Sequence, residues 1–292
     1  MDYANPRALV STEWLAENLL APGVHVIDAT FFLPTQGRDA KAEYAAAHIP
    51  GAVFFDIDDI ADSSTDLPHM LPSADKFSAK VGALGIANGD YVVAYDANGG
   101  ALAAVRAWWM FRVFGHDKVA VLNGGLPKWR AEGRPLTAEA TPLRDRHLTV
   151  TPRRDMAVDA TEVARAVKLG THAIVDARAT ARFEGGAPEP RAGLRSGHVP
   201  GSRNLFFRDL LRPDGTMRDE AGIRAAFAGA GVDLDRPVIT TCGSGVTAAV
   251  LSLALERIGK TDHQLYDGSW SEWGMFPDLP VETGPAKDNL EG

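Results

Sequence analysis

The chain of 292 residues repeats itself, and this repetition limits its possible folds more than any other feature of the sequence. HVIDA at 25–29 resembles AIVDA at 173–177, and AHIPGAVFFD at 47–56 resembles GHVPGSRNLFFRD at 197–209. The first member of each pair precedes the second by 148 and 150 residues, respectively. Nearly equal offsets indicate that one unit occurs twice.

Two further pairs extend the repeat toward the end of each half. YVVAY at 91–95 corresponds to PVITT at 237–241, and LNGGLPKW at 122–129 corresponds to YDGSWSEW at 266–273, with offsets of 146 and 144 residues. A slow drift of the offset is what loop insertions produce, and the segments keep their order. The sequence therefore predicts a duplicated domain.

Each half alternates short apolar, β-branched runs with amphipathic helical patterns, which is typical of βαβ units around a parallel sheet. Asp159 and Glu162 have the spacing of a capping box ahead of VARAV. Gly259 is expected to end a helix that begins near Val246. We therefore expect an α/β fold with two tandem domains, each a mainly parallel sheet flanked by helices.

The region between the two halves differs in composition from both of them. Residues 133–155 contain three prolines and have weak periodicity, so they are interpreted as an ordered or semi-ordered linker. We expect a first domain at 1–135, a linker at 136–155 and a second domain at 156–292.

Composition excludes several classes of function. A formal net charge of -8 argues against a nucleic-acid or anionic-membrane surface, which would need clustered positive charge. No run approaches the roughly 18 apolar residues of a membrane span, and the start lacks a signal-peptide pattern. A cytoplasmic protein with a small-molecule or protein partner is expected. The single cysteine rules out an internal disulfide and a cysteine-rich zinc site.

That cysteine, Cys242, follows the strand-like PVITT and precedes the loop 243–247 and a helical segment. Glycines in such a loop let successive backbone N–H groups point inward, and the helix adds the positive end of its dipole. The combination forms a cradle for an anion and favours a thiolate. A buried structural cysteine is the alternative, but a position at the carboxyl end of a parallel strand favours a nucleophile.

Several motifs together resemble the tandem-domain rhodanese family of thiosulfate and mercaptopyruvate sulfurtransferases. They are CGSGVTA at 242–248, HIPGA and GHVPG in the two halves, HMLP at 69–72 and DGSWSEW at 267–273. The resemblance covers nearly the whole chain and implies two rhodanese-like domains, with the nucleophile in the second and no metal or organic cofactor. Asp96 occupies the first-half position that matches Cys242, and a carboxylate cannot carry a sulfane sulfur. The first domain is therefore expected to be inactive in this chemistry.

The residues after the cysteine bear on the sulfur donor. Thiosulfate sulfurtransferases place cationic side chains there, whereas this chain has Gly243 and Ser244, as the mercaptopyruvate-type members of the family do. The resemblance also implies that Arg182 and Arg191, the latter in APEPR, bind the oxo acid, for which the planar guanidinium fork is suited. Arg195 has no such match in the family.

The same resemblance implies a proton relay of Ser244, His69 and Asp58, with the last two supplied by the first domain. The active site would then lie at the domain interface, a common place for small-molecule pockets. Matching turns in both halves contain His48 and His198, and this symmetry favours a structural role for them.

The expected reaction begins with attack of Cys242 on the sulfur of 3-mercaptopyruvate, which releases pyruvate and leaves a persulfide on the cysteine. Backbone N–H groups of Gly243, Gly245, Val246 and Thr247 would stabilise the charge. The sulfur would then pass to a thiol acceptor such as thioredoxin or a small dithiol, or to cyanide.

Other functions are weighed against this one. A thiosulfate:cyanide sulfurtransferase and a non-enzymatic sulfur-carrier or binding module remain open alternatives. A cysteine phosphatase normally ends its loop in an arginine, and Ala248 stands at that position. A serine hydrolase would need glycines two residues on either side of Ser244, where Cys242 and Val246 stand.

Overall fold

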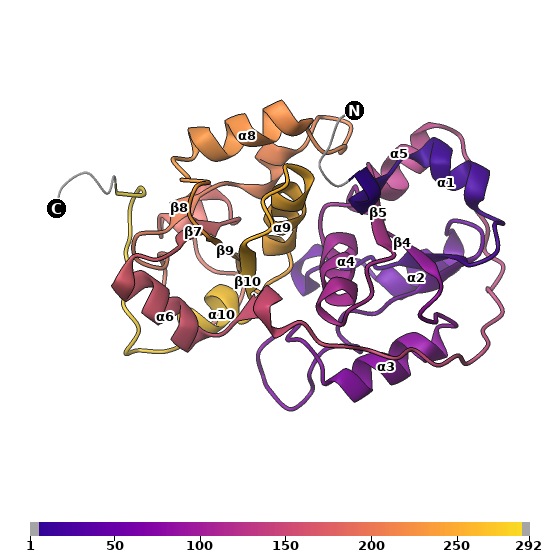
Figure 1. Cartoon of the computed structure of the whole chain (residues 1–292), viewed down its shortest axis with the longest axis horizontal. Helices are drawn as coiled ribbons and strands as arrows, with labels where there is room; N and C mark the ends of the chain where they lie inside the picture. The colour runs from indigo at the N-terminus through magenta and orange to yellow at the C-terminus, as the bar shows by residue number, and fades with distance from the viewer. Residues whose placement is uncertain (1–5, 288–292) are drawn as a thin grey trace.

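Two five-stranded parallel sheets, one in each half of the chain, form the framework of the computed structural model, which describes residues 6–287. Their strand orders are β1-β5-β4-β2-β3 and β6-β10-β9-β7-β8. Each strand of the first sheet thus has its counterpart five strands later, in the same place. The repeat predicted from the sequence and the α/β fold class are confirmed, and Figure 1 shows the two domains side by side.

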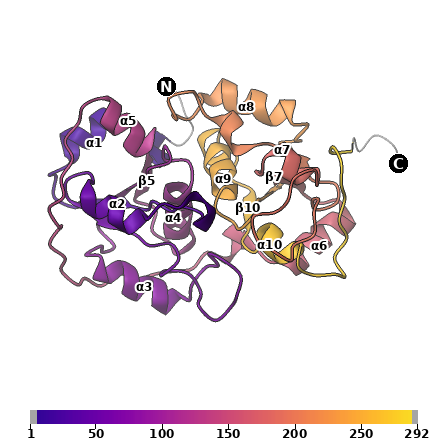
Figure 2. The ribbon, with the colours of Figure 1, turned by 180° about the vertical axis from the view of Figure 1, so that it is seen from behind.

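The first half begins each βα unit with a short strand, and helices lie on both faces of its sheet (Figures 1 and 2). Its elements are η1 Pro6–Ala8, β1 Leu9–Val10, α1 Thr12–Asn18, β2 Val24–Asp28, η2 Pro34–Gln36, α2 Ala40–Ala46, β3 Ala52–Phe54, α3 Ala74–Ala83, β4 Tyr91–Tyr95, α4 Ala103–Val113, β5 Val119–Leu122 and α5 Gly125–Ala131.

The second half repeats this order, except that its second 3-10 helix follows the third strand instead of the second. Its elements are η3 Arg154–Met156, β6 Ala157–Val158, α6 Ala160–Leu169, β7 Ala173–Asp176, α7 Thr180–Phe183, β8 Arg203–Asn204, η4 Phe207–Leu210, α8 Glu220–Gly229, β9 Val238–Thr241, α9 Ala248–Arg257, β10 His263–Tyr266 and α10 Ser269–Trp273.

The central strands are buried along almost their whole length because helices cover both faces of each sheet. All four residues of β9 are buried, as are the last four of β4, which explains why both read as apolar or β-branched runs. The carboxyl ends of β4 and β9 occupy equivalent positions in the two sheets. The loops that follow these strands can present side chains there.

The two domains pack through matching helices. α4 and α9 contact each other at the centre of the molecule, between the two sheets (Figures 1 and 2). Trp108 and Phe111 of α4 belong to one continuous buried cluster with Val250 and Leu253 of α9. Because this apolar core crosses the boundary, it fixes the loops of one domain against those of the other.

Helix boundaries follow the signals in the sequence. The Asp159 side chain accepts a hydrogen bond from the Glu162 N–H and the Glu162 side chain accepts one from the Asp159 N–H, which confirms the capping box. α9 begins two residues later than expected, because Val246 and Thr247 form a turn whose carbonyls accept from the first helical N–H groups. Gly259, with φ +78°, follows its C-cap.

The segment between the domains lies along the first one. The N–H groups of Arg146 and Thr151 donate to the carbonyls of Gly82 and Phe114, at 2.9 and 3.0 Å. A Cβ at Gly82 would lie 2.2 Å from the Arg146 carbonyl oxygen, so only glycine allows this close approach. No helix within residues 6–287 has the length and apolar character needed to cross a membrane.

Candidate active site

Cys242 lies directly after β9, at the carboxyl end of a central strand. Its side chain is a free thiol, and the residue is only 2% exposed. The residues of the loop that follows, 243–247, curve from the strand into α9. Burial at the end of the strand and before the helix shields the thiol from bulk solvent.

Ser269 anchors this loop from the neighbouring βα connection. Its Oγ accepts from the N–H groups of Cys242 at 3.2 Å and Gly245 at 3.1 Å, and donates to the Tyr266 carbonyl at 2.8 Å. Ser269 is fully buried and has φ +48°, a conformation that favours glycine. The sequence analysis missed this residue. The available signal was its alignment with Gly125 in the first half.

Four N–H groups of the loop remain open. Within residues 6–287, the backbone N–H groups of Gly243, Ser244, Val246 and Thr247 donate to no protein oxygen, whereas that of Gly245 is taken by Ser269. Gly245 contributes its conformation instead, with φ +73°. Unsatisfied donors at a helix N-terminus are suited to a developing negative charge on sulfur or oxygen.

The corresponding loop of the first domain is filled by an anion of the chain itself. The carboxylate of Asp96 is fully buried and accepts four backbone N–H groups. Oδ1 accepts from Asn98 and Gly100, both at 2.8 Å, and Oδ2 accepts from Leu102 at 3.1 Å and Ala104 at 3.0 Å. This backbone arrangement therefore accepts a carboxyl group. Burial raises the pKa of Asp96, and the four N–H donors oppose that effect by favouring the ionised form.

Arg182 lies against the Cys242 loop from the side of α7. A Cβ at Gly243 would lie 2.9 Å from Nη2 of Arg182, so the absence of a side chain at residue 243 makes room for the guanidinium. Nη2 also lies 2.5 Å from Oε2 of Glu189, which fixes its orientation. The cation beside the Cys242 loop is thus supplied by α7 and not by the loop itself.

Arg191 reaches the same space from the loop before β8. Its Nη2 lies 3.4 Å from Nε2 of His69, in the first domain. Burial lowers the pKa of Arg191, the charge of Arg182 adds to this effect, and the charge of Cys242 opposes it. Two arginines and the thiol therefore share one electrostatic environment.

Arg195 is placed differently, in agreement with the absence of a family match. Its guanidinium donates to four backbone carbonyls, those of Gly274, Leu279, Trp273 and Phe276, at 2.5 to 3.2 Å. These hydrogen bonds connect the loop that contains Arg195 to the end of α10 and the segment after it. They also occupy the N–H groups of the guanidinium.

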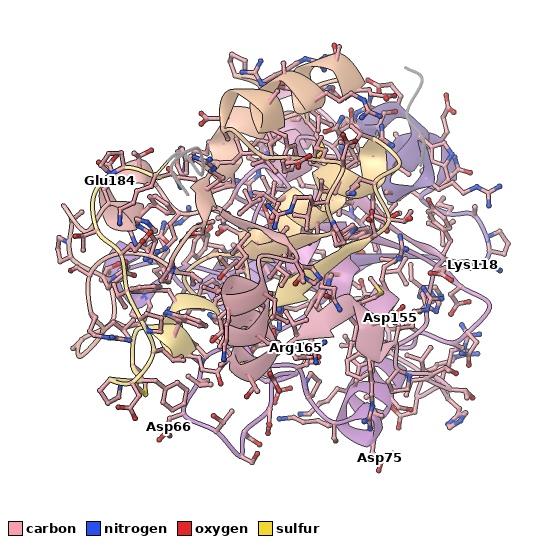
Figure 3. All side chains as sticks on the ribbon, turned by 60° about the vertical axis from the view of Figure 1, so that its left-hand side comes forward. Asp66, Asp75, Lys118, Asp155, Arg165 and Glu184 are labelled. Atoms are coloured by element: carbon pink, nitrogen blue, oxygen red, sulfur yellow. The ribbon has the colours of Figure 1, made fainter. Side chains whose placement is uncertain are left out.

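His69 and Asp58 come together at the domain boundary. Nδ1 of His69 lies 2.8 Å from Oδ1 of Asp58, a close contact that is not aligned as a straight hydrogen bond. The His69 ring packs edge-on against Phe31, with centroids 4.8 Å apart, and the residue is 5% exposed. Asp66, earlier on the same loop, lies at the outer edge of the molecule in Figure 3, so the chain descends from the surface to His69.

Ser244 is not joined to this pair. It is 8% exposed, yet within the described part of the chain its hydroxyl makes no hydrogen bond to His69, whose Nε2 faces Arg191 instead. The structure thus brings together Asp58, His69, Arg191, Arg182 and the Cys242 loop, while the contact between Ser244 and His69 is absent. No group of three or more potential metal-ligating side chains occurs within residues 6–287.

Comparisons with known proteins identify the family of the chain. A family model described as the rhodanese-like domain matches residues 11–132 and 159–275. A 3-mercaptopyruvate sulfurtransferase of Escherichia coli is 42% identical over 274 residues, covering 94% of this chain and 97% of its own. A thiosulfate sulfurtransferase of Cricetulus griseus is 44% identical over 283 residues, covering 95% and 94%. The crystal structure of SseA from Escherichia coli, described under 3-mercaptopyruvate sulfotransferases, matches this chain with a TM-score of 0.83 at 40% identity. The match covers 91% of this chain and 99% of the SseA chain.

Proposed function

The chain belongs to the rhodanese family, and from this premise we propose that it transfers a sulfane sulfur from 3-mercaptopyruvate to a thiol acceptor through a persulfide on Cys242. It is an enzyme of the sulfurtransferase class. The observation that carries the proposal is the placement of its only cysteine beside open N–H donors, two arginines and a histidine.

The first half-reaction moves one sulfur atom and one proton. The Cys242 thiolate attacks the thiol sulfur of 3-mercaptopyruvate, an S–S bond forms, and the C–S bond breaks with its electron pair left on carbon. The resulting pyruvate enolate takes up a proton at carbon, and the persulfide gives up the proton that the donor thiol carried. The products are pyruvate and an ionised cysteine persulfide, and no oxidant is required.

The cationic groups would orient the donor and balance its charge. We assign Arg182 and Arg191 to the carboxylate and the 2-oxo group, because both guanidinium groups lie beside the Cys242 loop. The open N–H groups of Ser244, Val246 and Thr247 would stabilise the persulfide charge. Gly243 provides the space for Arg182, and Gly245 provides the turn.

Proton movement is assigned to His69 and Asp58. Their 2.8 Å contact supports a histidine that is oriented by a carboxylate and acts on the donor as acid or base. Ser244 has no protein partner on the His69 side in this structure. We therefore propose that Ser244 joins the relay only through the bound donor, which would lie between the two side chains.

The second half-reaction requires an external acceptor, because the chain has one cysteine and so no resolving thiol of its own. A thiol such as thioredoxin or a small dithiol would attack the outer sulfur and restore the thiolate, and cyanide would do so in an assay with formation of thiocyanate. We propose a cytoplasmic location, because a reducing compartment supplies such thiols and keeps Cys242 reduced. We also propose that the first domain ends at residue 135 and the second begins at residue 156, with a linker between them.

The test is the intact mass of the protein after incubation with donor. We expect 3-mercaptopyruvate to add one sulfur atom to the wild type, cyanide to remove it, and Cys242→Ser to take none. A wild type that takes sulfur from neither 3-mercaptopyruvate nor thiosulfate would contradict the proposal and favour a binding module.

Thiosulfate as the main donor is the second candidate, favoured by the 44% identity to a thiosulfate sulfurtransferase. Overall identity does not separate the donors, since the mercaptopyruvate relative is 42% identical. Comparing kcat/KM for the two donors decides between them, and a larger value for thiosulfate would overturn our choice.

A further inference from the structure

A buried ion pair crosses the domain boundary beside the Cys242 loop and has no part in the reaction described above. Arg106, on α4 of the first domain, is fully buried, and Asp267, directly after β10 of the second, is 6% exposed. Nη2 of Arg106 lies 2.7 Å from Oδ1 of Asp267, and the guanidinium carbon lies 4.5 Å from the centre of the Trp109 ring. A charge pair at such depth adds little net stability, because the cost of removing both charges from water offsets their attraction.

The pair contacts both parts of the active site. Nη2 of Arg106 donates to the His69 carbonyl at 2.5 Å, and Nη1 donates to the Gly245 carbonyl at 3.4 Å. Oδ2 of Asp267 accepts from the N–H of Leu71 at 2.8 Å. The backbone directly after the His69 side chain and the middle of the Cys242 loop are thus tied to one pair of side chains.

His69 needs such support because its backbone is in an unfavourable conformation. Its φ of +61° lies in the left-handed region, which residues with a Cβ rarely adopt. Such a residue keeps that conformation only where the surroundings hold it, and these residues concentrate at functional sites. The carbonyl that Arg106 binds belongs to this residue.

The inactive half of the molecule provides an internal comparison. Met217 lies two residues before the N-cap of α8, as Leu71 does before that of α3, and its N–H donates to Oδ1 of Asn123 at 2.9 Å. Asn123 is the repeat counterpart of Asp267, and Gly215, with φ +80°, stands where His69 does. The hydrogen bond is therefore the same in both halves, but the side chain that accepts it is neutral in the inactive one.

The counterpart of Arg106 also lacks a charge. The turn of α9 that lies 144 to 146 residues further along the chain consists of Val250, Leu251 and Ser252. The ion pair thus occurs only at the interface where a histidine replaces glycine and a cysteine replaces aspartate. A requirement of the fold alone would apply to both interfaces.

We propose that Arg106 and Asp267 are positioning residues that hold His69 and the Cys242 loop in register across the domain boundary. The proposal rests on the sulfurtransferase function proposed above. Because one partner comes from each domain, the pair forms only when the domains are docked. Docking and the placement of His69 are therefore coupled.

The test replaces the pair by the residues of the inactive half. Arg106→Leu with Asp267→Asn removes both charges together, so no unpaired charge stays buried, and keeps an acceptor for the Leu71 N–H. The control is Arg112→Leu, on the same helix, whose Nη2 lies 3.2 Å from Oε1 of Glu256 in the other domain and touches neither His69 nor the cysteine loop. If the double variant does not fold, Arg106→Lys serves as the milder variant, because it keeps a cation beside Asp267 and loses the guanidinium fork that binds the His69 and Gly245 carbonyls.

We expect the double variant to lower kcat with 3-mercaptopyruvate about 10- to 100-fold and to change KM less than about threefold, as misplacement of a catalytic group does. The control should stay within about threefold of the wild type in both constants. Adding His69→Ala to the double variant should lower kcat by less than the two separate losses combined, because the pair acts in part through His69. Wild-type kcat in the folded double variant, or effects that add, would overturn the proposal.

A second readout does not depend on sulfur transfer. The rate at which iodoacetamide alkylates Cys242 should change at least about threefold in the double variant and not in Arg112→Leu, because only the former releases the loop at Gly245. Equal alkylation rates in the wild type and both variants would contradict the positioning role. If the wild type takes up no sulfur but the alkylation rates of the wild type and the double variant still differ, only the proposed reaction is contradicted.

Discussion

The loops after β4 and β9 share one backbone plan and differ in how they are held. In the first domain the carboxylate of Asp96 binds four N–H groups and ties the loop from within. In the second, Cys242 replaces the carboxylate and Ser269 ties the loop from outside. Anchoring from outside leaves the N–H groups of Ser244 and Val246 open. The Cys242 loop thus differs from the Asp96 loop both in the residue at the strand end and in the side chain that holds the loop backbone in place.

The surroundings of the two loops differ as well. Each faces a segment from the other domain, and His69 stands on one of these segments where Gly215 stands on the other. The Cβ positions at Gly99 and Gly215 would lie within 4 Å of the opposite backbone, so the inactive site is closed by direct backbone contact. We therefore expect sulfur transfer to depend on the opposite domain as well as on the cysteine.

The largest expected effect comes from making the active loop like the inactive one. Cys242→Asp should lower turnover of 3-mercaptopyruvate by about 10^4-fold or more, because no nucleophile remains. The fold should persist, since Asp96 shows that this loop accepts a carboxylate. Turnover and the intact mass measure the loss, and circular dichroism checks the fold.

The reverse substitution tests whether the cysteine alone is sufficient. Asp96→Cys, made together with Cys242→Ser, should take no sulfur from 3-mercaptopyruvate, because Gly215 and closely packed backbone face that loop. A sulfur adduct on Cys at residue 96 would show that a cysteine is sufficient without the surroundings of the Cys242 loop.

Ser269→Gly is the next test, because Gly125 is its counterpart in the inactive half. The change relieves the unfavourable φ of +48° but removes the acceptor for the Cys242 and Gly245 N–H groups. We expect kcat/KM to fall about 10- to 100-fold, since a loosened loop no longer presents its donors in place. Steady-state kinetics with 3-mercaptopyruvate measures this.

Ser271→Ala is its matched control. The Ser271 hydroxyl donates to the Gly243 carbonyl at 2.6 Å, but the Ser271 backbone N–H also binds that carbonyl at 2.9 Å and would remain. Its kcat/KM should fall less than about fivefold. Equal losses in the two variants would mean that the anchor is shared rather than centred on Ser269.

A smaller effect is expected from Gly243→Ala, which installs the residue type of Ala97. The new Cβ would lie 2.9 Å from Nη2 of Arg182, the end of a flexible side chain that can move aside. We expect KM for 3-mercaptopyruvate to rise about three- to tenfold with a smaller change in kcat, because donor orientation is weakened. An unchanged KM would remove the support for Arg182 as a donor ligand.

Much of this framework is encoded in local sequence patterns. The offset of the repeat predicts two sheets of the same order, and the run before Cys242 predicts its place at the end of a buried strand. The capping residues Asp159 and Glu162 mark a helix start correctly. Such features depend on neighbours in the chain, so periodicity and capping chemistry are sufficient to find them.

The details of the site depend on contacts between distant segments. Ser269 lies 27 residues from Cys242, and Arg106 lies 139 residues from Gly245, so no local pattern reveals that they touch. The same holds for the expected contact between Ser244 and His69. The family resemblance implies this contact, but Nε2 of His69 faces Arg191 instead. Side-chain direction and domain docking decide these contacts.

The smallest effect on activity is expected at the paired histidines His48 and His198, which occupy matching turns. Nδ1 of each ring binds a backbone carbonyl, that of Tyr44 at 2.8 Å and that of Phe183 at 2.9 Å. The rings stack on the same two residues, with centroids 4.2 and 3.8 Å apart. Because the arrangement is present in both domains, we expect it to support folding and not sulfur transfer.

His198→Gln should therefore leave kcat within about twofold while lowering the free energy of unfolding by about 1–3 kcal/mol at pH 8, through the lost hydrogen bond and stacking. His48→Gln should cost a similar amount. Urea unfolding and steady-state kinetics measure the two effects. A large loss of kcat in the His198 variant alone would mean that the second-domain turn has been adapted for catalysis.

The cost of His198→Gln should also depend on pH. Burial lowers the pKa of His198 below its ordinary value of 6.5. As the pH falls through 6.5, the unfolded wild type takes up a proton at this residue before the folded protein does, so His198 contributes less to stability. Glutamine does not titrate, and the difference in unfolding free energy between wild type and variant should shrink from pH 8 to pH 5.5. A difference that grows toward low pH would mean that the folded protein favours the protonated ring, through Glu282, whose Oε2 lies 3.8 Å from Nε2.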